Sequence, residues 1–379
     1  MRQLDKEASV SYFDDLKQTI LINSYTKNKN GVDDVGVLFD GWMGALGYEV
    51  TLHRRGLIGD HRHYVAPRGP GKRLLLLGHL DTVFPPDTFD HYDEDERWVY
   101  GPGVCDMKGG NIVALQALRN LHASGEAIRN VDMLLVSDEE SGSDDSKLLS
   151  AQLAVDYDYC LVFEAAGAKM EAVAARKGVG TFTVDIEGVA KHAGNSYAEG
   201  VDANLEAARK LEALVALTDL EKGTTVNVGK MEGGIGANTI SPHAHLLFEL
   251  RYKSAAERDR VLAAVDTIVA TSYVSGTKAT LGGGIQRDVM QRTPETEAFV
   301  ADIERIAGIT LATEERGGVS DANILSAAGV VTLDGFGPYG DGDHTRHERA
   351  LKESFPERIA LTERLLRYFT THLDFRENV

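Results

Sequence analysis

Histidine and acidic residues stand at the ends of the short aliphatic runs of this 379-residue chain. The residues that follow such runs are His79, Asp81, Asp138, Glu139, Glu140, Glu164 and, across a glycine-rich loop, His344. Asp106 stands just before the first predicted crossover helix. Because the parallel strands of an open α/β sheet end at one edge, we expect these side chains to meet there. Taken singly, each residue is more typical of a solvated loop or a helix cap, but their joint occurrence at successive strand ends favours one site.

The residue types in this set predict a metal centre. Imidazole nitrogens and carboxylate oxygens, with no cysteine among them, suit zinc or a similar divalent ion. These residues come from five separate positions along the chain, and five ligands exceed the need of one catalytic zinc, which takes three protein ligands and a water. With one carboxylate bridging, they suit two ions about 3.5–4 Å apart. Glu139 then remains unassigned beside a ligand and is free to serve as a base.

The elements that would position these residues alternate between strands and helices. The runs at 73–78, 131–137 and 159–163 predict strands buried on both faces, and the run at 329–333 predicts another. Helices are expected between the first two strands, at about 107–124, and at the end of the chain, at about 355–371. This order predicts an α/β domain built on a mostly parallel sheet.

The middle of the chain has a different pattern, which predicts a second domain. Its expected elements are a strand at 180–188, a helix at 201–217, strands at 224–231 and 244–252, a helix with an apolar stripe from 261 to 269, and a strand near 277–281. The order β-α-β-β-α-β is typical of a small ferredoxin-like domain. We therefore expect a catalytic domain in two parts, 1–176 and 291–379, with a lid and dimerisation domain inserted at 177–290. Clefts between domains commonly bind small ligands.

Composition and charge exclude several classes of function. The chain has 58 acidic and 40 basic residues, and its net charge of −18 argues against nucleic acid and anionic membranes as partners. The sequence contains no run of about 18 apolar residues, so no membrane span is predicted. The charged N-terminus predicts no secretory signal, and two cysteines, Cys105 and Cys160, fit a reducing compartment. We expect a cytoplasmic protein that acts on a small molecule or short peptide.

Six motifs carry a resemblance to a known family. They are GHLDTVFP (78–85), GPGVCDMKGG (101–110), SDEESGS (137–143), VFEA (162–165), AKHAG (190–194) and HTRHE (344–348). In these motifs the chain resembles the di-zinc aminopeptidase, carboxypeptidase and deacylase family, and especially the glutamate carboxypeptidases of the carboxypeptidase G type. The resemblance extends over essentially the whole chain, with the motifs in the family order.

The resemblance implies a role for each metal ligand. His79 and Glu164 would bind one zinc ion, Glu140 and His344 the other, and Asp106 would bridge the two. Cobalt or manganese are alternatives to zinc, and relatives with a single metal ion exist. The family also implies a cis peptide bond after the bridging aspartate.

Further roles follow from the same resemblance. Glu139 would be the general base and acid, and Asp81 would orient His79. His347 competes with His344 for the last ligand position, but Thr345 after His344 fits the family pattern better.

The inserted domain contributes its own candidates. His192 would help to stabilise the oxyanion in the active site of a partner subunit, which implies a homodimer formed through the lid domain. Asn238 and Arg251 would bind the carboxylate of the substrate, since an arginine can donate two parallel hydrogen bonds to it. The loop RGGVSDA (316–322) would lie near the same group.

These residues predict a zinc-dependent amide hydrolase. We expect an exopeptidase that releases a C-terminal amino acid such as glutamate from N-acyl or peptide substrates. The alternative within the family is an N-acyl-amino-acid deacylase of the acetylornithine, succinyl-diaminopimelate or aminoacylase type. A non-catalytic metal-binding relative is a third interpretation, which the presence of Glu139 and every ligand disfavours.

Overall fold

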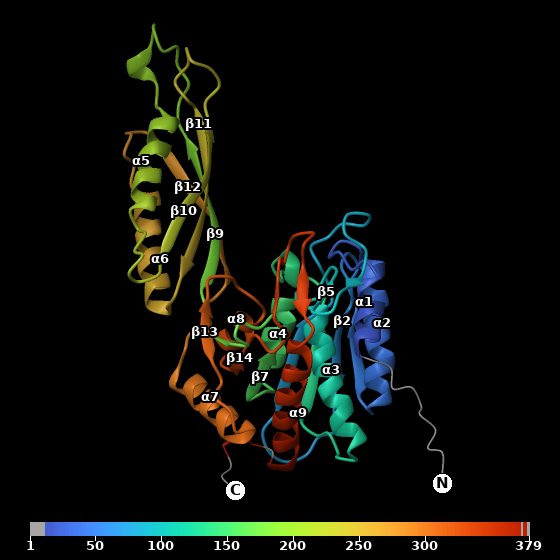
Figure 1. Cartoon of the computed structure of the whole chain (residues 1–379). Helices are drawn as coiled ribbons and strands as arrows, with labels where there is room; N and C mark the ends of the chain where they lie inside the picture. Colours follow the sequence, from blue (N-terminus) through green and yellow to red (C-terminus); the bar gives the residue numbers. More distant parts are fainter. Residues whose placement is uncertain (1–11, 373, 377–379) are drawn as a thin grey trace, which may run out of the picture. The chain divides into compact units, whose positions relative to one another are not determined.

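The chain forms two compact units, each built from more than one segment of the sequence (Figure 1). A computed structural model describes residues 12–372 and 374–376. The first unit runs through Ala175 and also contains Arg292–Glu315 and the chain from Ser320 onward, whereas the second contains Arg176–Gln291 and Arg316–Val319. Residues 1–11, on which the expectation of no secretory signal partly rests, lie outside the described residues. Among the described helices, none has the length and apolar character needed to cross a membrane.

A six-stranded sheet forms the centre of the first unit. Its strands lie in the order β1 (Glu49–His53), β2 (His61–Val65), β6 (Val131–Val136), β3 (Leu74–His79), β7 (Tyr159–Val162) and β14 (Val331–Leu333). The four strands from β6 to β14 are parallel to one another, whereas β2 pairs antiparallel with β6 and β1 pairs antiparallel with β2. The prediction of a mostly parallel α/β sheet is confirmed. The strands β1 and β2 were not predicted from the sequence.

The sheet is covered by helices that complete its core. These are α1 (Tyr12–Ile20), α2 (Lys29–Ala45), α3 (Lys108–Ala123), α4 (Ser146–Ala154), α7 (Pro294–Ala307), α8 (Ala322–Ala327) and α9 (Ser354–His372). The helix α3 packs against α1, β3 and α9, and most of its side chains are buried. The aliphatic residues of β3 and β6 are buried on both faces, as expected for strands between helical layers.

Two smaller sheets accompany the central sheet. One contains β4 (Asp93–Glu94), β5 (Trp98–Tyr100), β16 (Arg349–Leu351) and β15 (Gly340–Asp341), and the other pairs β8 (Ala172–Arg176) with β13 (Thr313–Arg316). The sheet of β4, β5, β15 and β16 joins two segments that are far apart in sequence, because Arg349 pairs with Tyr100.

The second unit has the β-α-β-β-α-β order. Its elements are β9 (Gly178–Glu187), α5 (Ala203–Val215), β10 (Thr225–Gly233), β11 (His243–Tyr252), α6 (Ala255–Ala270) and β12 (Lys278–Arg287). The antiparallel sheet has the order β10-β11-β9-β12, and its alternating apolar residues pack with α5 and α6 in a separate core. This is the strand order of a ferredoxin-like fold.

A buried lysine holds the two helices of this unit together. Lys210 in α5 is fully buried, and its Nζ donates hydrogen bonds to the carbonyl oxygens of Ile268, Val269 and Thr271 at 2.7, 3.1 and 2.6 Å. Nζ also lies 2.9 Å from a carboxylate oxygen of Glu206, which is buried as well. The positive charge therefore satisfies the last carbonyl groups of α6, where the helix dipole is negative.

Candidate metal centre

The register of the central sheet places three strand ends at the same level. His79, the last residue of β3, pairs with Val136 at the end of β6, and Leu77 pairs with Val162 at the end of β7. Glu164 therefore lies as far beyond Val162 as His79 lies beyond Leu77. The chain after β6 forms a short 3₁₀ turn, Glu139–Ser141, which brings Glu139 and Glu140 to the same edge.

His79, Asp106 and Glu164 form the first of two clusters at this edge. The Nε2 atom of His79 lies 3.1 Å from Oδ1 of Asp106 and 3.7 Å from Oε1 of Glu164. One donor atom from each residue lies within 4.8 Å of the other two. Asp106 stands at the end of the loop before α3, next to a cis peptide bond to Met107. The cis bond implied by the family resemblance is thus confirmed.

Asp106, Glu140 and His344 form the second cluster. The Nε2 atom of His344 lies 3.1 Å from Oε2 of Glu140 and 3.3 Å from Oδ2 of Asp106. Asp106 therefore presents one carboxylate oxygen to each cluster. His347, the competing candidate for the last ligand position, belongs to neither cluster. The five candidate ligands thus come together as two sets of three that share one carboxylate.

The electrostatics of the clusters suit positive ions. Burial and the negative charge of Asp106 raise the pKa of Glu140 and Glu164 well above the usual value. Although burial opposes the change, hydrogen bonds from His344 and His79 lower the pKa of Asp106. Three carboxylates and two imidazoles in so small a volume form a donor set with excess negative charge, which one or two divalent cations would neutralise.

Asp81 contacts both His79 and the turn that carries the two glutamates. Nδ1 of His79 lies 3.0 Å from the main-chain oxygen of Asp81 and 3.4 Å from its carboxylate. The fully buried carboxylate accepts a hydrogen bond from Oγ1 of Thr26 at 2.6 Å and from the backbone N–H groups of Glu139 and Glu140 at 3.3 and 3.2 Å. Asp81 therefore orients His79 mainly through its backbone, while its side chain holds the 3₁₀ turn. The second contact was not anticipated from the sequence.

His192 and Asn238 lie side by side in the second unit. The backbone N–H of Ala193 donates to the carbonyl oxygen of Asn238 at 2.9 Å, and His192 forms an isolated β-bridge with Thr239. Nδ1 of the exposed His192 accepts hydrogen bonds from the N–H groups of Gly194 and Asn195. In the neutral imidazole the proton is therefore on Nε2, which is left as a donor.

Arg251 already has partners on all three sides of its guanidinium group. Nε and Nη2 donate to the carboxylate of Glu249 at 2.7 and 3.2 Å, and Nη1 donates to the carbonyl oxygen of Gly317 at 2.9 Å. Gly317 belongs to the loop RGGVSDA, so this loop and Arg251 are in contact, as the resemblance suggests. Glu249 occupies the fork that a substrate carboxylate would need.

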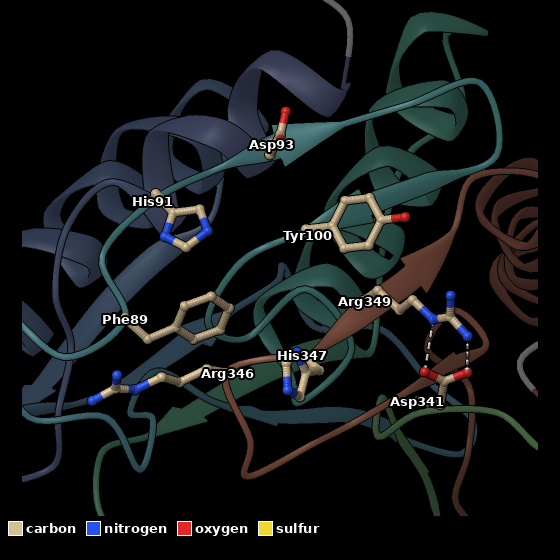
Figure 2. Close-up of a pocket in the computed structure, with 8 residues that line it drawn as sticks. All are labelled: Phe89, His91, Asp93, Tyr100, Asp341, Arg346, His347 and Arg349. Carbon is tan, nitrogen blue, oxygen red and sulfur yellow. Dashed lines mark hydrogen bonds and ion pairs between the residues drawn. The ribbon is translucent and has the colours of Figure 1, made fainter.

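A cavity of about 420 Å³ lies over the four-stranded sheet of the first unit (Figure 2). It is lined by Phe89, His91, Asp93, Tyr100, Asp341, Arg346, His347 and Arg349. Arg349 forms two hydrogen bonds with Asp341, as Figure 2 shows, and its guanidinium lies over the ring of Trp98. His347 is thus part of the wall of this cavity.

His61 and His63 lie buried in β2, although the polar sequence of this segment is typical of a charged loop. Nε2 of His61 lies 3.0 Å from the carboxylate of Asp145, and His63 contacts the hydroxyl group of Tyr157 at 2.7 Å. Nδ1 of His61 accepts the N–H of Ser137, so this histidine supports the chain just before the 3₁₀ turn.

The fold and the clusters together define a class of protein. A mostly parallel α/β sheet, whose strand ends gather two His/carboxylate clusters around one shared aspartate, is the framework of a metallo-hydrolase. The chain belongs to the peptidase family M20/M25/M40, whose family model matches residues 75–368.

Known relatives include a peptidase and a deacetylase. The chain is 28% identical over 369 residues to carboxypeptidase G2 of Pseudomonas sp. (strain RS-16), with 93% of this chain and 87% of that protein covered. It is 29% identical over 302 residues to N-acetyl-L-citrulline deacetylase of Xanthomonas campestris, with 75% and 78% covered. Among solved structures, a tripeptidase of Staphylococcus aureus is similar in fold, with a TM-score of 0.80 at 22% identity and 95% and 98% of the two chains covered.

Proposed function

We propose that this protein is a zinc-dependent exopeptidase that releases a C-terminal amino acid such as glutamate from N-acyl or peptide substrates. The observation that carries the proposal is the pair of clusters that share Asp106, with Glu139 in the same turn as the ligand candidate Glu140. His79, Asp106 and Glu164 would hold one zinc ion, and Asp106, Glu140 and His344 the other. Cobalt or manganese are the alternatives.

The residues of the chain would divide the reaction between them. Bound zinc supplies a water of lowered pKa and polarises the carbonyl group of the substrate. Glu139, which is 9% exposed, would take the proton from the attacking water and return it to the leaving amine. The Nε2–H of His192 would donate a hydrogen bond to the developing oxyanion. Asp81 would keep His79 and the 3₁₀ turn in place.

Recognition of a C-terminal carboxylate would fall to Arg251 and Asn238. The contact of Arg251 with Gly317 supports this role, because it holds the guanidinium group at the glycine-rich loop. A substrate carboxylate would replace that of Glu249 on the arginine fork, an exchange of like charge for like charge. The similarity to carboxypeptidase G2 over 93% of the chain supports the same assignment.

The second candidate function is an N-acyl-amino-acid deacylase. The specific observation in its favour is the similarity to N-acetyl-L-citrulline deacetylase, which is as high in identity as that to carboxypeptidase G2. Both reactions hydrolyse an amide bond at the same kind of centre. They differ in which side of that bond the protein recognises.

One substrate panel separates these candidates. Amine release would be measured with added zinc from N-acyl-glutamates and pteroyl-glutamate, and in parallel from acetylornithine, succinyl-diaminopimelate and acetyl-methionine. Turnover confined to the compounds with C-terminal glutamate is the expected result. Turnover of the other group alone would transfer the proposal to the deacylase. Zinc-loaded protein that hydrolyses none of them would contradict both.

We also propose a cytoplasmic homodimer formed through the second unit. The exposed position of His192, away from the clusters in sequence and in a different unit, supports a role across subunits. The test is a mixture of two inactive variants, His192→Ala and Glu139→Ala, refolded or co-expressed together. Recovered activity is expected, because a mixed dimer would hold one complete site. Mixtures as inactive as their components, with monomers on a sizing column, would exclude the dimer.

A further inference from the structure

Glu348 binds the backbone of the loop that ends at the shared aspartate. The residue is 1% exposed. One carboxylate oxygen accepts a hydrogen bond from the N–H of Gly103 at 3.0 Å, and the other accepts from the N–H groups of Cys105 and Asp106 at 3.0 and 3.2 Å. These three hydrogen bonds fix the backbone from which the Asp106 side chain projects.

The same residue also belongs to the segment that carries His344. Its backbone N–H donates to the carbonyl oxygen of Thr345 at 3.2 Å, and its own carbonyl oxygen accepts from the N–H of Gly101 at 3.3 Å. The N–H of Thr345 in turn donates to the carbonyl oxygen of Gly342 at 3.0 Å, which closes the turn around His344. Glu348 thus joins two segments that are far apart in sequence and that each carry a ligand candidate.

The two clusters depend on this joint to different degrees. His79 of the first cluster is fixed by its own strand and by Asp81, and Nδ2 of Asn111 donates to its carbonyl oxygen at 2.7 Å. His344, by contrast, has a positive φ of 60° in an exposed turn, and 56% of its side chain is exposed. Its distance to Asp106 therefore depends on how the two segments are held together.

We propose that Glu348 is a positioning residue that sets the geometry of the second cluster by tying the loop of Asp106 to the turn of His344. The inference rests on the proposed metal centre. It predicts that the loss of the Glu348 carboxylate weakens the ion held by Asp106, Glu140 and His344 much more than the ion held by His79, Asp106 and Glu164.

The test compares Glu348→Gln with wild type and with Glu353→Gln. The glutamine has the same size and can accept fewer of the three N–H groups, and Glu353 is an exposed residue nearby, so its variant controls for the change in charge. Zinc binding to the full-length metal-free chains would be titrated against a chelator, with thermal melting of the same samples. We expect one of the two ions to bind about 10–100-fold more weakly in Glu348→Gln, as for other residues that support metal ligands. The other ion should change by less than about 3-fold, and Glu353→Gln should match wild type.

His344→Ala identifies the affected ion through a double-mutant cycle. If Glu348 acts through the second cluster, Glu348→Gln should have little further effect on zinc binding in the His344→Ala background. Equal weakening of both ions, full additivity with His344→Ala, or unchanged zinc binding would each overturn the proposal. If Glu348→Gln melts too low to titrate, Glu348→Asp, which keeps the charge on a shorter side chain, serves for the same comparison. Wild-type protein that binds no zinc would instead refute the proposed metal centre itself.

Discussion

Zinc binding to this protein should be strongly coupled to pH. In the metal-free protein both ring nitrogens of His79 face acceptors, since Nδ1 lies 3.0 Å from the carbonyl oxygen of Asp81 and Nε2 lies 3.1 Å from Asp106. An imidazole can donate from both nitrogens only when it is protonated. Nε2 of His344 likewise faces two carboxylates. Zinc must displace a proton from Nε2 of His79 and from Nε2 of His344, whereas Nδ1 of His79 can keep its proton and donate to Asp81.

The expected size and sign follow from the shifted pKa values. Hydrogen bonds to Asp106 and Glu140 raise the pKa of His344 from 6.5 to about 11. The hydrogen bonds of His79 to Asp106 and Asp81 outweigh its burial and raise its pKa well above 6.5. Each imidazolium stabilises the metal-free fold fully below pH 6.5, and this stabilisation is lost as the pH rises through the higher folded value.

Zinc affinity should follow the opposite course, because zinc competes with these protons. We expect the apparent affinity at each cluster to rise about tenfold per pH unit, or roughly 100-fold between pH 6 and 8.

Calorimetry with a competing chelator at several pH values, in buffers of different ionisation enthalpy, measures both the affinity and the protons released. About one proton per zinc ion is expected at pH 7. His344→Ala should abolish proton release at one of the two sites, whereas His347→Ala, an exposed histidine outside both clusters, should leave the profile unchanged. An affinity that does not vary with pH, after correction for the chelator, would refute the reasoning.

Three further substitutions test separate parts of the structure. Glu139→Ala should lower kcat by about 10²–10⁴-fold with zinc still bound, as expected for loss of a general base; near-normal turnover would remove Glu139 from the mechanism. Arg251→Lys should raise KM for substrates with a C-terminal carboxylate about tenfold and leave kcat nearly constant, because lysine cannot form the bidentate contact; an unchanged KM would contradict the carboxylate role. Lys210→Met should lower the unfolding free energy by about 3–5 kcal/mol, since it leaves the buried carboxylate of Glu206 without its cationic partner. In chemical denaturation the exposed Arg209→Met serves as its control, and equal effects of the two would contradict the buried-pair argument.

The parallel strands could be predicted because their sequences are unambiguous. Continuous aliphatic runs such as RLLLLG exclude solvent-exposed strands, and the alternation in the second unit marks strands with one buried face. The strand β2, which lies between β1 and β6, could not be recognised in the same way. Its sequence HRHYV is polar, and the partners that make burial acceptable lie far away: Ser137 and Asp145 for His61, and Tyr157 for His63, at separations of 76, 84 and 94 residues.

The candidate ligands could be located from the sequence because strand order alone brings them to one edge. The supporting contacts could not, because many of them are made to the backbone. The carboxylates of Asp81 and Glu348 accept main-chain N–H groups, and any residue type supplies such a donor. Glu249 likewise gave no signal as the partner of Arg251, since two charges on one face of a strand are common on a solvated surface.

The division of the first unit by the inserted residues has a consequence for synthesis on the ribosome. His79, Asp106 and Glu164 all precede the insertion, whereas His344 follows it. Strands β3, β6 and β7 can associate as soon as they emerge, but β14 and the covering helix α9 are translated more than 150 residues later. The growing chain therefore exposes one face of α3 and presents a complete first cluster long before the second exists. We expect the nascent protein to bind a metal ion at the first cluster before the second. We also expect prompt folding of the inserted unit to shorten the time for which the uncovered face of α3 can aggregate.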